Sequence, residues 1–282
     1  MKRFLIIGAI AALIILAGTW IYVSVSVPNL KTLQERKVVE STKIYDNTGK
    51  VLLYDIHSDI KRTLIPFDKI PQNLKNATVA IEDAEFYKHS GISFTSIIRS
   101  FIIDIISGQF RQGGSTITQQ LVKKAFLTDD RTLSRKIKEV VLALKVESKY
   151  SKDEILNLYL NEIPYGASSF GVEAASETYF GKPAENLDLA ESAYLAALPN
   201  APTRYSPYGN HINELEARKN LILERMKNLK LIDDAEFNSA KKEKVIFTNR
   251  ALEGIRAPHF VMYVKEYLVD KYGEDKIGRA HV

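Results

Sequence analysis

The chain has 282 residues, of which 45% are hydrophobic and 26% are charged, and its formal net charge is +5. This composition excludes a mainly disordered protein and allows one or two domains with a substantial core. The sequence contains no cysteine, which excludes disulfides, thiolate metal sites and cysteine nucleophiles.

The first feature along the chain is a long apolar segment. Residues Phe4 to Val27 carry no charged side chain over 24 residues, enough to cross roughly 30 Å of hydrocarbon as a helix. A cleavable signal usually has an apolar core of only about 7 to 15 residues, so this segment favours an uncleaved signal anchor. Because Lys2 and Arg3 precede it, we expect a single-pass protein of the cytoplasmic membrane with its working part outside the cytoplasm.

The remainder of the chain divides into an extended segment, a helical domain and a tail. Residues 28–70 read as a stalk with a hairpin at the turn signal Asn47-Thr-Gly49, residues 71–245 as a mainly α-helical domain, and 246–282 as a linker. The expected helices cover 74–88, 94–107, 115–126, 131–149, 152–161, 171–179, 187–197, 212–229 and 234–243, and Ser151 to Glu154 form a capping box before the fifth. The helix expected at 94–107 contains more isoleucine than one core-facing stripe needs. This indicates either a helix that lies partly in the membrane or a fully buried helix, in which Arg99 would need a partner.

An acidic pair lies near the end of the first expected helix. If that helix runs to Lys88, then Glu82, Phe86 and His89 fall on one face. Glu82 is then a candidate general base, and apolar burial or the charge of Asp83 is expected to raise its pKa from roughly 4.3 towards neutrality. The alternative is an ordinary solvated acidic surface.

Two polar and basic helix faces follow. Gly113 and Gly114 lead into a helix on which Ser115, Gln119 and Lys123 are spaced by four, a stripe suited to a phosphate or a sugar, or an ordinary polar face.

On the next helix, Arg131, Arg135, Lys138 and Glu139 form a cationic ridge around one acid. Glu139 either balances these charges or positions the donor or a divalent ion. From Arg111 to Tyr150 there are nine Lys or Arg and four acids. This local basic patch suits anionic lipid or a phosphorylated lipid better than nucleic acid.

These segments resemble the peptidoglycan glycosyltransferases of class A penicillin-binding proteins, glycosyltransferase family 51. The matching motifs are Glu82-Asp-x-x-Phe-x-x-His-x-Gly91, Gly114-Ser-Thr-Ile-Thr-Gln-Gln120, Arg135-Lys-x-x-Glu139, Ile155-Leu-x-x-Tyr-Leu-Asn161, and Leu198-Pro-x-Ala-Pro202 with Tyr205 and Pro207. Each motif alone is weak, but five in the family's order and spacing, across roughly Val38 to Arg225, make accidental agreement very improbable.

The resemblance implies a lysozyme-like helical fold with a membrane-associated jaw near residues 94–112, and lipid II as the substrate. It implies that Glu82 deprotonates the acceptor sugar and that Glu139 is a second essential acid. The donor-phosphate side would be lined by Ser115, Gln119, Lys123, Arg131, Arg135, Lys136 and Lys138. The other substrate-site residues it assigns are Asp83, Phe86, Thr116, Gln120 and Asn161, of which Phe86 and Asn161 have an architectural character.

The residue chemistry favours transfer over hydrolysis. A glycosidase protonates a poor leaving group with one of two carboxylates, whereas lipid pyrophosphate leaves as a stable anion and needs positive charge. Mg²⁺ or another divalent cation would assist, although no residue cluster demands it. The expected partners are lipid II, the growing glycan strand, membrane lipid and other cell-wall synthesis proteins, without nucleic acid. The alternatives are a lytic transglycosylase or muramidase that uses Glu82 as an acid, and a non-catalytic anchored protein that binds wall precursors.

The segment from Ala257 to Val264 resembles the connection to the transpeptidase domain of bifunctional class A proteins. We expect the natural protein to continue into such a domain. The last residues, 277–282, resemble a translated sequencing adapter and receive no functional weight.

Overall fold

The protein is described here from a computed structural model, which covers residues 42–56, 61–93, 114–127, 132–248 and 257–272, together with Gly18 and Thr95. Helices make up most of these residues, which confirms the expected mainly α class. The chain divides into two compact units, one containing Glu85–Ile155 and the other containing Lys37–Ala84 and Leu156–Val282. Each unit is described separately below.

The first unit is built on two packed helices. It contains the 3-10 turn η2 (Phe86–Lys88), α5 (Ile117–Phe126), α6 (Leu133–Lys149) and the start of α7 (Lys152–Glu162). Helices α5 and α6 pack against each other. Apolar residues recur at helical spacing on both, so each presents one apolar stripe. The fully or almost fully buried side chains are Ile117, Leu121, Val122, Val141, Leu142 and Val146.

Side-chain caps determine where these helices begin. Thr116 caps α5 in a reciprocal capping box with Gln119, and Thr132 caps α6 by accepting from the backbone N–H of Arg135. The capping box that the sequence predicts at Ser151 and Glu154 is confirmed. Because α5 begins at Ile117, Ser115 precedes the helix, which corrects the predicted start at residue 115.

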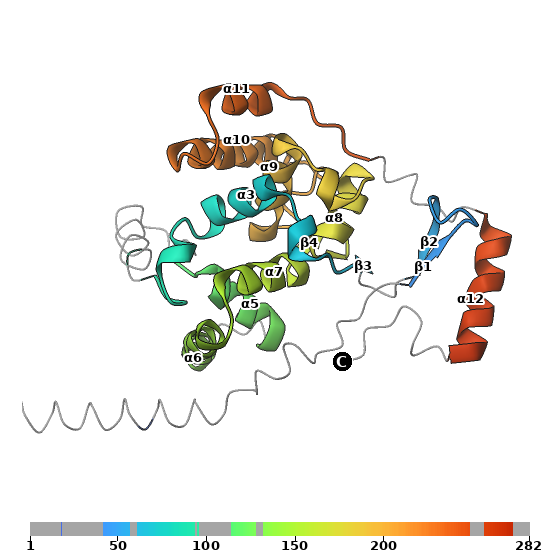
Figure 1. Ribbon diagram of the computed structural model, residues 1–282, viewed down its shortest axis with the longest axis horizontal. Helices are drawn as coiled ribbons and strands as arrows, with labels where there is room; N and C mark the ends of the chain where they lie inside the picture. The colour runs from blue at the N-terminus through green and yellow to red at the C-terminus, as the bar shows by residue number, and fades with distance from the viewer. Residues whose placement is uncertain are drawn as a thin grey trace, which may run out of the picture. The chain divides into compact units, whose positions relative to one another are not determined.

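The second unit contains most of the helices. They are α3 (Gln72–Glu82), the rest of α7, α8 (Val172–Phe180), α9 (Leu189–Ala197), α10 (Ile212–Asn228), α11 (Asp234–Lys242) and α12 (Pro258–Tyr272), with short turns η1 (Phe67–Lys69), η3 (Ala184–Asn186) and η4 (Leu198–Asn200). Helices α3, α9 and α10 pack mutually, as Figure 1 shows. Small buried side chains such as Ala77, Ala80 and Ala193 allow α3 and α9 to approach closely.

Two small sheets complete this unit. Strands β1 (Thr42–Tyr45) and β2 (Leu52–Ile56) form an antiparallel hairpin, which confirms the predicted one, and Gly49 adopts a φ of 69° in its turn. The second sheet has the order β3-β5-β4, in which β3 (Lys61–Arg62) pairs parallel to β5 (Ser169–Phe170) and β4 (Pro164–Gly166) pairs antiparallel to it. This sheet is not predicted from the sequence, because strands of two or three residues show no periodicity.

Part of the expected stalk is bound into the helical unit. The Asn161 carboxamide on α7 accepts from the backbone N–H of Ile65 at 2.9 Å and donates to the Ile65 carbonyl at 3.1 Å. Residues 61–70 therefore contribute a strand and the buried side chains of Arg62, Ile65 and Ile70 to the second unit.

The expected linker at 246–282 contains a helix, α12. Its residue Val261 is fully buried and shares a small apolar cluster with Ile44 of β1. Leu53, Tyr54 and Val264 pack against this pair. The hairpin and α12 therefore form one packed group from segments about 200 residues apart in the chain.

The first expected helix of the domain is shorter than the sequence predicts. Helix α3 ends at Glu82, and Asp83 adopts a non-helical φ of −159° and ψ of 77°. Phe86 lies in the separate turn η2. The prediction that Glu82, Phe86 and His89 share one helical face is therefore wrong.

Among the described residues, the structure contains no helix with the length and apolar character of a membrane span. The predicted span Phe4–Val27 lies outside the described residues, apart from Gly18, and so does the expected jaw at 94–112, apart from Thr95. Both stay predictions.

The Asn161 contacts lead to a first prediction. Asn161→Ala leaves the buried N–H and C=O of Ile65 without their side-chain partners, so we expect it to lower the free energy of unfolding by about 2 to 4 kcal/mol. Asn238→Ala, at an exposed position of α11, is the matched control and should change stability by no more than about 0.5 kcal/mol. Urea unfolding followed by circular dichroism measures both, and equal effects would contradict the assigned role.

Candidate functional site

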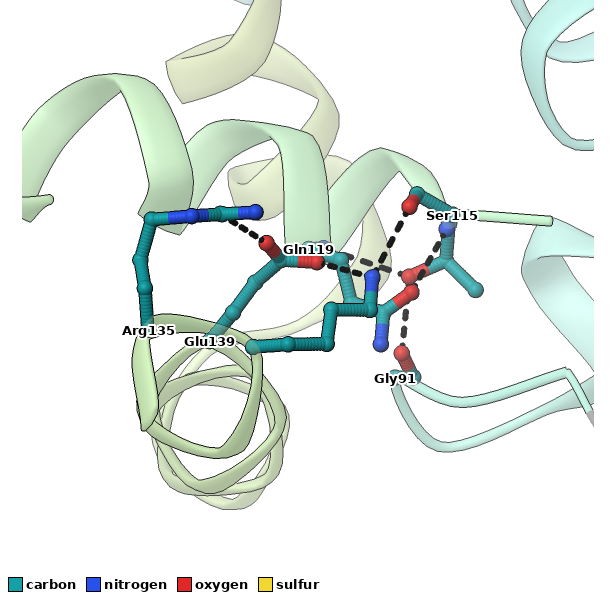
Figure 2. A network of polar contacts seen from close by, with 7 residues as sticks. Gly91, Ser115, Gln119, Arg135 and Glu139 are labelled. Atoms are coloured by element: carbon teal, nitrogen blue, oxygen red, sulfur yellow. Dashed lines mark hydrogen bonds and ion pairs between the residues drawn. The ribbon is translucent and has the colours of Figure 1, made fainter. Parts of the chain in front are cut away.

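The first unit carries a polar cluster centred on Glu139, shown in Figure 2. Glu139 Oε2 lies 2.6 Å from Arg135 Nη1, and Glu139 Oε1 contacts the amino group of Lys136. The same Lys136 amino group donates to the Ser115 hydroxyl at 3.0 Å. The structure thus brings three residues predicted for the donor side, Ser115, Arg135 and Lys136, together with the second predicted acid, Glu139.

The spacing of the α6 residues produces this cluster. Arg135 and Lys136 precede Glu139 by four and three positions, so all three lie on one helix face. The Glu139 side chain is only 2% exposed, whereas Lys136 is 42% exposed. A buried carboxylate is costly unless cations compensate it. Two cations around one carboxylate leave the cluster with a net positive charge and an accessible amino group, which suits an anionic ligand.

The segment before α5 is attached to the chain around Gly91. The Thr116 hydroxyl donates to the Gly91 carbonyl at 2.7 Å, and the Thr116 N–H donates to the Gln119 carboxamide at 3.0 Å. Gly91 has a φ of 86°, and a Cβ there would lie 2.9 Å from Glu147 Cγ and 3.2 Å from the Ala143 carbonyl oxygen. Only glycine fits this position without strain. Thr116 and Gln119 are buried, so their hydrogen bonds support the segment that holds Ser115.

Two other predicted donor-side residues, Lys123 on α5 and Lys138 on α6, are half-buried, and so is the predicted substrate-site residue Gln120 on α5. Arg131 lies outside the described residues. The roles of these four residues in binding stay predictions.

Glu139 was also a candidate to position a divalent ion. Mg²⁺ takes an octahedral set of oxygen ligands, but both carboxylate oxygens of Glu139 face the nitrogen atoms of Arg135 and Lys136. In the part of the chain that the structure describes, no three His, Asp or Glu side chains gather as a metal site. Both oxygens of Glu139 are thus occupied by cationic side chains in this arrangement, and a role for a divalent ion stays a prediction.

The second unit carries the other predicted acid, Glu82, as the last residue of α3. Its side chain is 9% exposed, and its Oε1 lies 3.6 Å from Arg218 Nη2 on α10. Arg225, seven residues further along α10, donates to the carbonyl of Ile81 at 3.0 Å. The following residue, Asp83, is also buried. Helix α10 therefore brings two cations to the carboxyl end of α3, where the helix dipole favours positive charge.

Two buried tyrosines respond electrostatically to Glu82. Burial, and next the charge of Glu82, raise the pKa of Tyr159 and of Tyr165. Arg218 acts on Tyr159 in the opposite direction, lowering its pKa. Tyr159 and Tyr165 therefore lie near the carboxyl group of Glu82, as does its neighbour Asp83.

The sequence motifs do not identify Arg218, Tyr159 and Tyr165 as neighbours of Glu82. The sequence does contain one signal for Arg218, because this residue lies between Leu215 and Ile222 at the spacing of the buried face of α10. A cation on a core-facing stripe needs a partner. The partner itself could not be identified, because it is 136 positions away in the sequence.

Phe86 and Asn161 have structural contacts. Phe86 is fully buried in the first unit, with the Lys152 amino group 4.4 Å from its ring centroid. Asn161 in the second unit holds Ile65, as described above. These contacts agree with the architectural character expected of both residues, and their contact with substrate stays a prediction.

Comparison with known proteins identifies the family. The family model described as "Transglycosylase" matches residues 49–227, and the chain therefore belongs to this transglycosylase family. This confirms the predicted family, the glycosyltransferase domain of class A penicillin-binding proteins.

The relatives are longer proteins. The chain is 40% identical over 281 residues to "Penicillin-binding protein 1A" of Aquifex aeolicus, covering 97% of this chain and 38% of the relative. It is 36% identical over 277 residues to "Penicillin-binding protein 1A" of Escherichia coli, covering 97% and 32%. The crystal structure of "Penicillin-Binding Protein 1A from Haemophilus influenzae" gives a TM-score of 0.46 at 26% identity, covering 84% of this chain and 25% of that one. The chain thus spans only about a third of the length of these curated relatives.

The Glu139 cluster yields a second prediction. Glu139→Gln removes the charge that holds Arg135 and Lys136 together, so we expect a loss of about 1 to 3 kcal/mol in the free energy of unfolding at low salt. The loss should shrink in about 0.5 M salt, because the repulsion that involves the exposed Lys136 is screened.

The control is Glu214→Gln, which removes one partner of an exposed ion pair with Arg204 and should change stability by less than about 1 kcal/mol. Thermal unfolding at both salt concentrations makes the comparison. Unchanged stability of Glu139→Gln at low salt would show that the two cations do not depend on this carboxylate.

Proposed function

We propose that this protein polymerises lipid II into β-1,4-linked glycan strands by inverting displacement of undecaprenyl pyrophosphate. The observation that carries the proposal is the net positive cluster of Arg135, Lys136 and Ser115 around the buried Glu139. Membership of the transglycosylase family supports it.

On the donor side, the chemistry needs stabilisation of negative charge. The bond from the anomeric carbon to the pyrophosphate oxygen breaks, and the pyrophosphate departs as a stable anion that requires no proton. Arginine and lysine form strong charge-assisted hydrogen bonds to phosphate oxygens. Arg135 and Lys136 are proposed to bind the departing group, with Lys123, Lys138 and Arg131 as further phosphate contacts.

On the acceptor side, the chemistry needs a proton acceptor. The carboxylate of Glu82 is proposed to take the proton of the acceptor 4-hydroxyl while that oxygen attacks the anomeric carbon. A single displacement inverts the configuration, which converts an α-linked lipid pyrophosphate into a β-linked glycan. The proton then passes from Glu82 to solvent, so the cycle leaves the enzyme unchanged. No step is assigned to a divalent ion.

The remaining assignments belong to the same proposal. A lysozyme-like fold, anchorage in the cytoplasmic membrane and a catalytic domain outside the cytoplasm follow from the resemblance and from the apolar segment Phe4–Val27. The relatives named as penicillin-binding proteins support cell-wall synthesis as the setting. Asp83, Gln120, Thr116 and the growing strand are proposed as parts of the substrate-binding arrangement.

The proposed base gives a third prediction. Glu82→Gln is nearly isosteric and cannot accept the proton, so we expect polymerisation of labelled lipid II to fall by at least about 100-fold. The exposed Glu224 on α10 provides the control Glu224→Gln, which should polymerise normally. Gel sizing of the glycan products measures the activity, and circular dichroism checks the fold.

The same assay separates the competing functions. Long strands from lipid II support a polymerase. Fragments released from finished peptidoglycan, without polymerisation, would identify a hydrolase or lytic transglycosylase, and binding without turnover would identify a precursor-binding protein. Undiminished polymerisation by Glu82→Gln would exclude Glu82 as the base.

A fourth prediction concerns the donor side. Lys136→Gln removes an accessible cation from the proposed pyrophosphate site, so we expect kcat/KM for lipid II to fall by about 10- to 100-fold, and Lys136→Arg should recover part of the loss. The matched control is Lys149→Gln, at an exposed position of the same helix. Equal activity of the Lys136 and Lys149 variants would remove Lys136 from the site.

A further inference from the structure

We infer that Arg218 is a positioning residue that acts through Glu82, keeping its carboxyl group ionised and therefore able to accept a proton. This inference rests on the proposed function, because it explains how Glu82 remains a base. It is drawn entirely from contacts within the second unit.

Arg218 is fixed by three contacts. Its Nε donates to the carbonyl of Ala197 at 3.1 Å, its guanidinium lies 5.3 Å from the ring centroid of Tyr205, and its Nη2 lies 3.6 Å from Glu82 Oε1. The side chain is 16% exposed. Two of the contacts therefore hold the guanidinium in place independently of Glu82.

The distance indicates the kind of interaction. At 3.6 Å, Arg218 and Glu82 form an ion pair whose separation exceeds that of a direct hydrogen bond. The interaction is thus mainly Coulombic. A Coulombic contact acts on the charge of the carboxyl group, and it is strengthened by partial burial because little water screens it.

Burial and the neighbouring carboxyl group of Asp83 oppose the ionisation of Glu82. Asp83 is a buried neighbouring carboxyl group, and burial of Glu82 itself disfavours charge. The facing groups on α7 and β4, Tyr159 and Tyr165, are fully buried phenols whose pKa values are raised, so they carry no charge at neutral pH. Arg225, also on α10, donates to the carbonyl of Ile81. Arg218 forms the ion pair with Glu82 and so offsets the effects of burial and of Asp83 at this end of α3.

The carboxyl group of Glu82 could serve either as a general acid or as a general base. A general acid must hold a proton at the working pH, whereas a general base must be without one. An adjacent arginine favours the ionised form. The geometry around Glu82 therefore suits proton acceptance from a sugar hydroxyl and disfavours proton donation to a glycosidic oxygen.

The test compares pH profiles of lipid II polymerisation by the full chain. Without the guanidinium, Glu82 should become protonated at a higher pH. In Arg218→Gln, the acidic limb of the plot of kcat/KM against pH should therefore shift to higher pH by about 1 to 3 units. The kcat/KM of Arg218→Gln should be lower than that of the wild type by about 10-fold or more on the acidic side, and this difference should become smaller as the pH rises. Arg218→Lys keeps the charge and should restore most of the limb.

The control is Lys227→Gln, which removes a cation from the same helix and ends an ion pair with Asp234 at 2.6 Å. Its profile should match that of the wild type. A loss in Arg218→Gln that is uniform across the pH range would assign Arg218 a structural role and overturn the inference, as would an unshifted limb.

A second measurement does not depend on activity. NMR titration of ¹³C-labelled glutamate carboxyl groups, with the Glu82 signal identified by its loss in Glu82→Gln, gives the pKa of Glu82 directly. A higher pKa in Arg218→Gln supports the inference, and an equal pKa overturns it. If the wild type does not polymerise lipid II while the pKa shifts as expected, the proposed function fails and the coupling between Arg218 and Glu82 stands.

Discussion

A buried carboxylate is costly unless positive charge or hydrogen bonds compensate it, and this constraint accounts for the ion pairs of the candidate site residues in both units. In the first unit, Glu139 is held by Arg135 and Lys136, and Glu147 is held by Lys152 at 2.8 Å. In the second unit, Glu82 at the end of α3 faces Arg218. Desolvation of each acid would cost several kcal/mol without these partners. The positions of the cations therefore depend on the acids that they compensate.

Hydrogen bonds also hold the backbone in place next to these acids. The capping box of Thr116 and Gln119 starts α5 immediately after Ser115, and the hydrogen bond from Thr116 to Gly91 secures the neighbouring segment. In the second unit, Arg225 holds the carbonyl of Ile81 at the last turn of α3. Local hydrogen bonds thus fix the chain next to each acid, while the ion pair fixes the acid itself.

How much of the structure the sequence predicts depends on how far apart in the chain the interacting residues lie. Arg135, Lys136 and Glu139 are within one turn of a helix, so their spacing alone predicts their proximity. The helix end at Glu82 was missed, because an apolar pattern does not reveal where hydrogen bonding stops. The pairing of β3 with β5, the packing of α12 on the hairpin, and the pair of Glu82 with Arg218 depend on tertiary contacts between distant segments. No local pattern contains that information.

The two acids differ in their charge balance, and this difference agrees with their different proposed roles. Glu139 has two cations, one of them accessible, so its cluster keeps positive charge available for an anion even though the carboxylate is almost fully buried. Glu82 pairs with Arg218 at a longer distance and has two neutral phenols nearby. The pair with Arg218 offsets the negative charge of Glu82 at a distance beyond that of a direct hydrogen bond, which suits a carboxylate that accepts a proton. Environments that separate two carboxyl groups in this way are how one enzyme obtains two functions from the same chemical group.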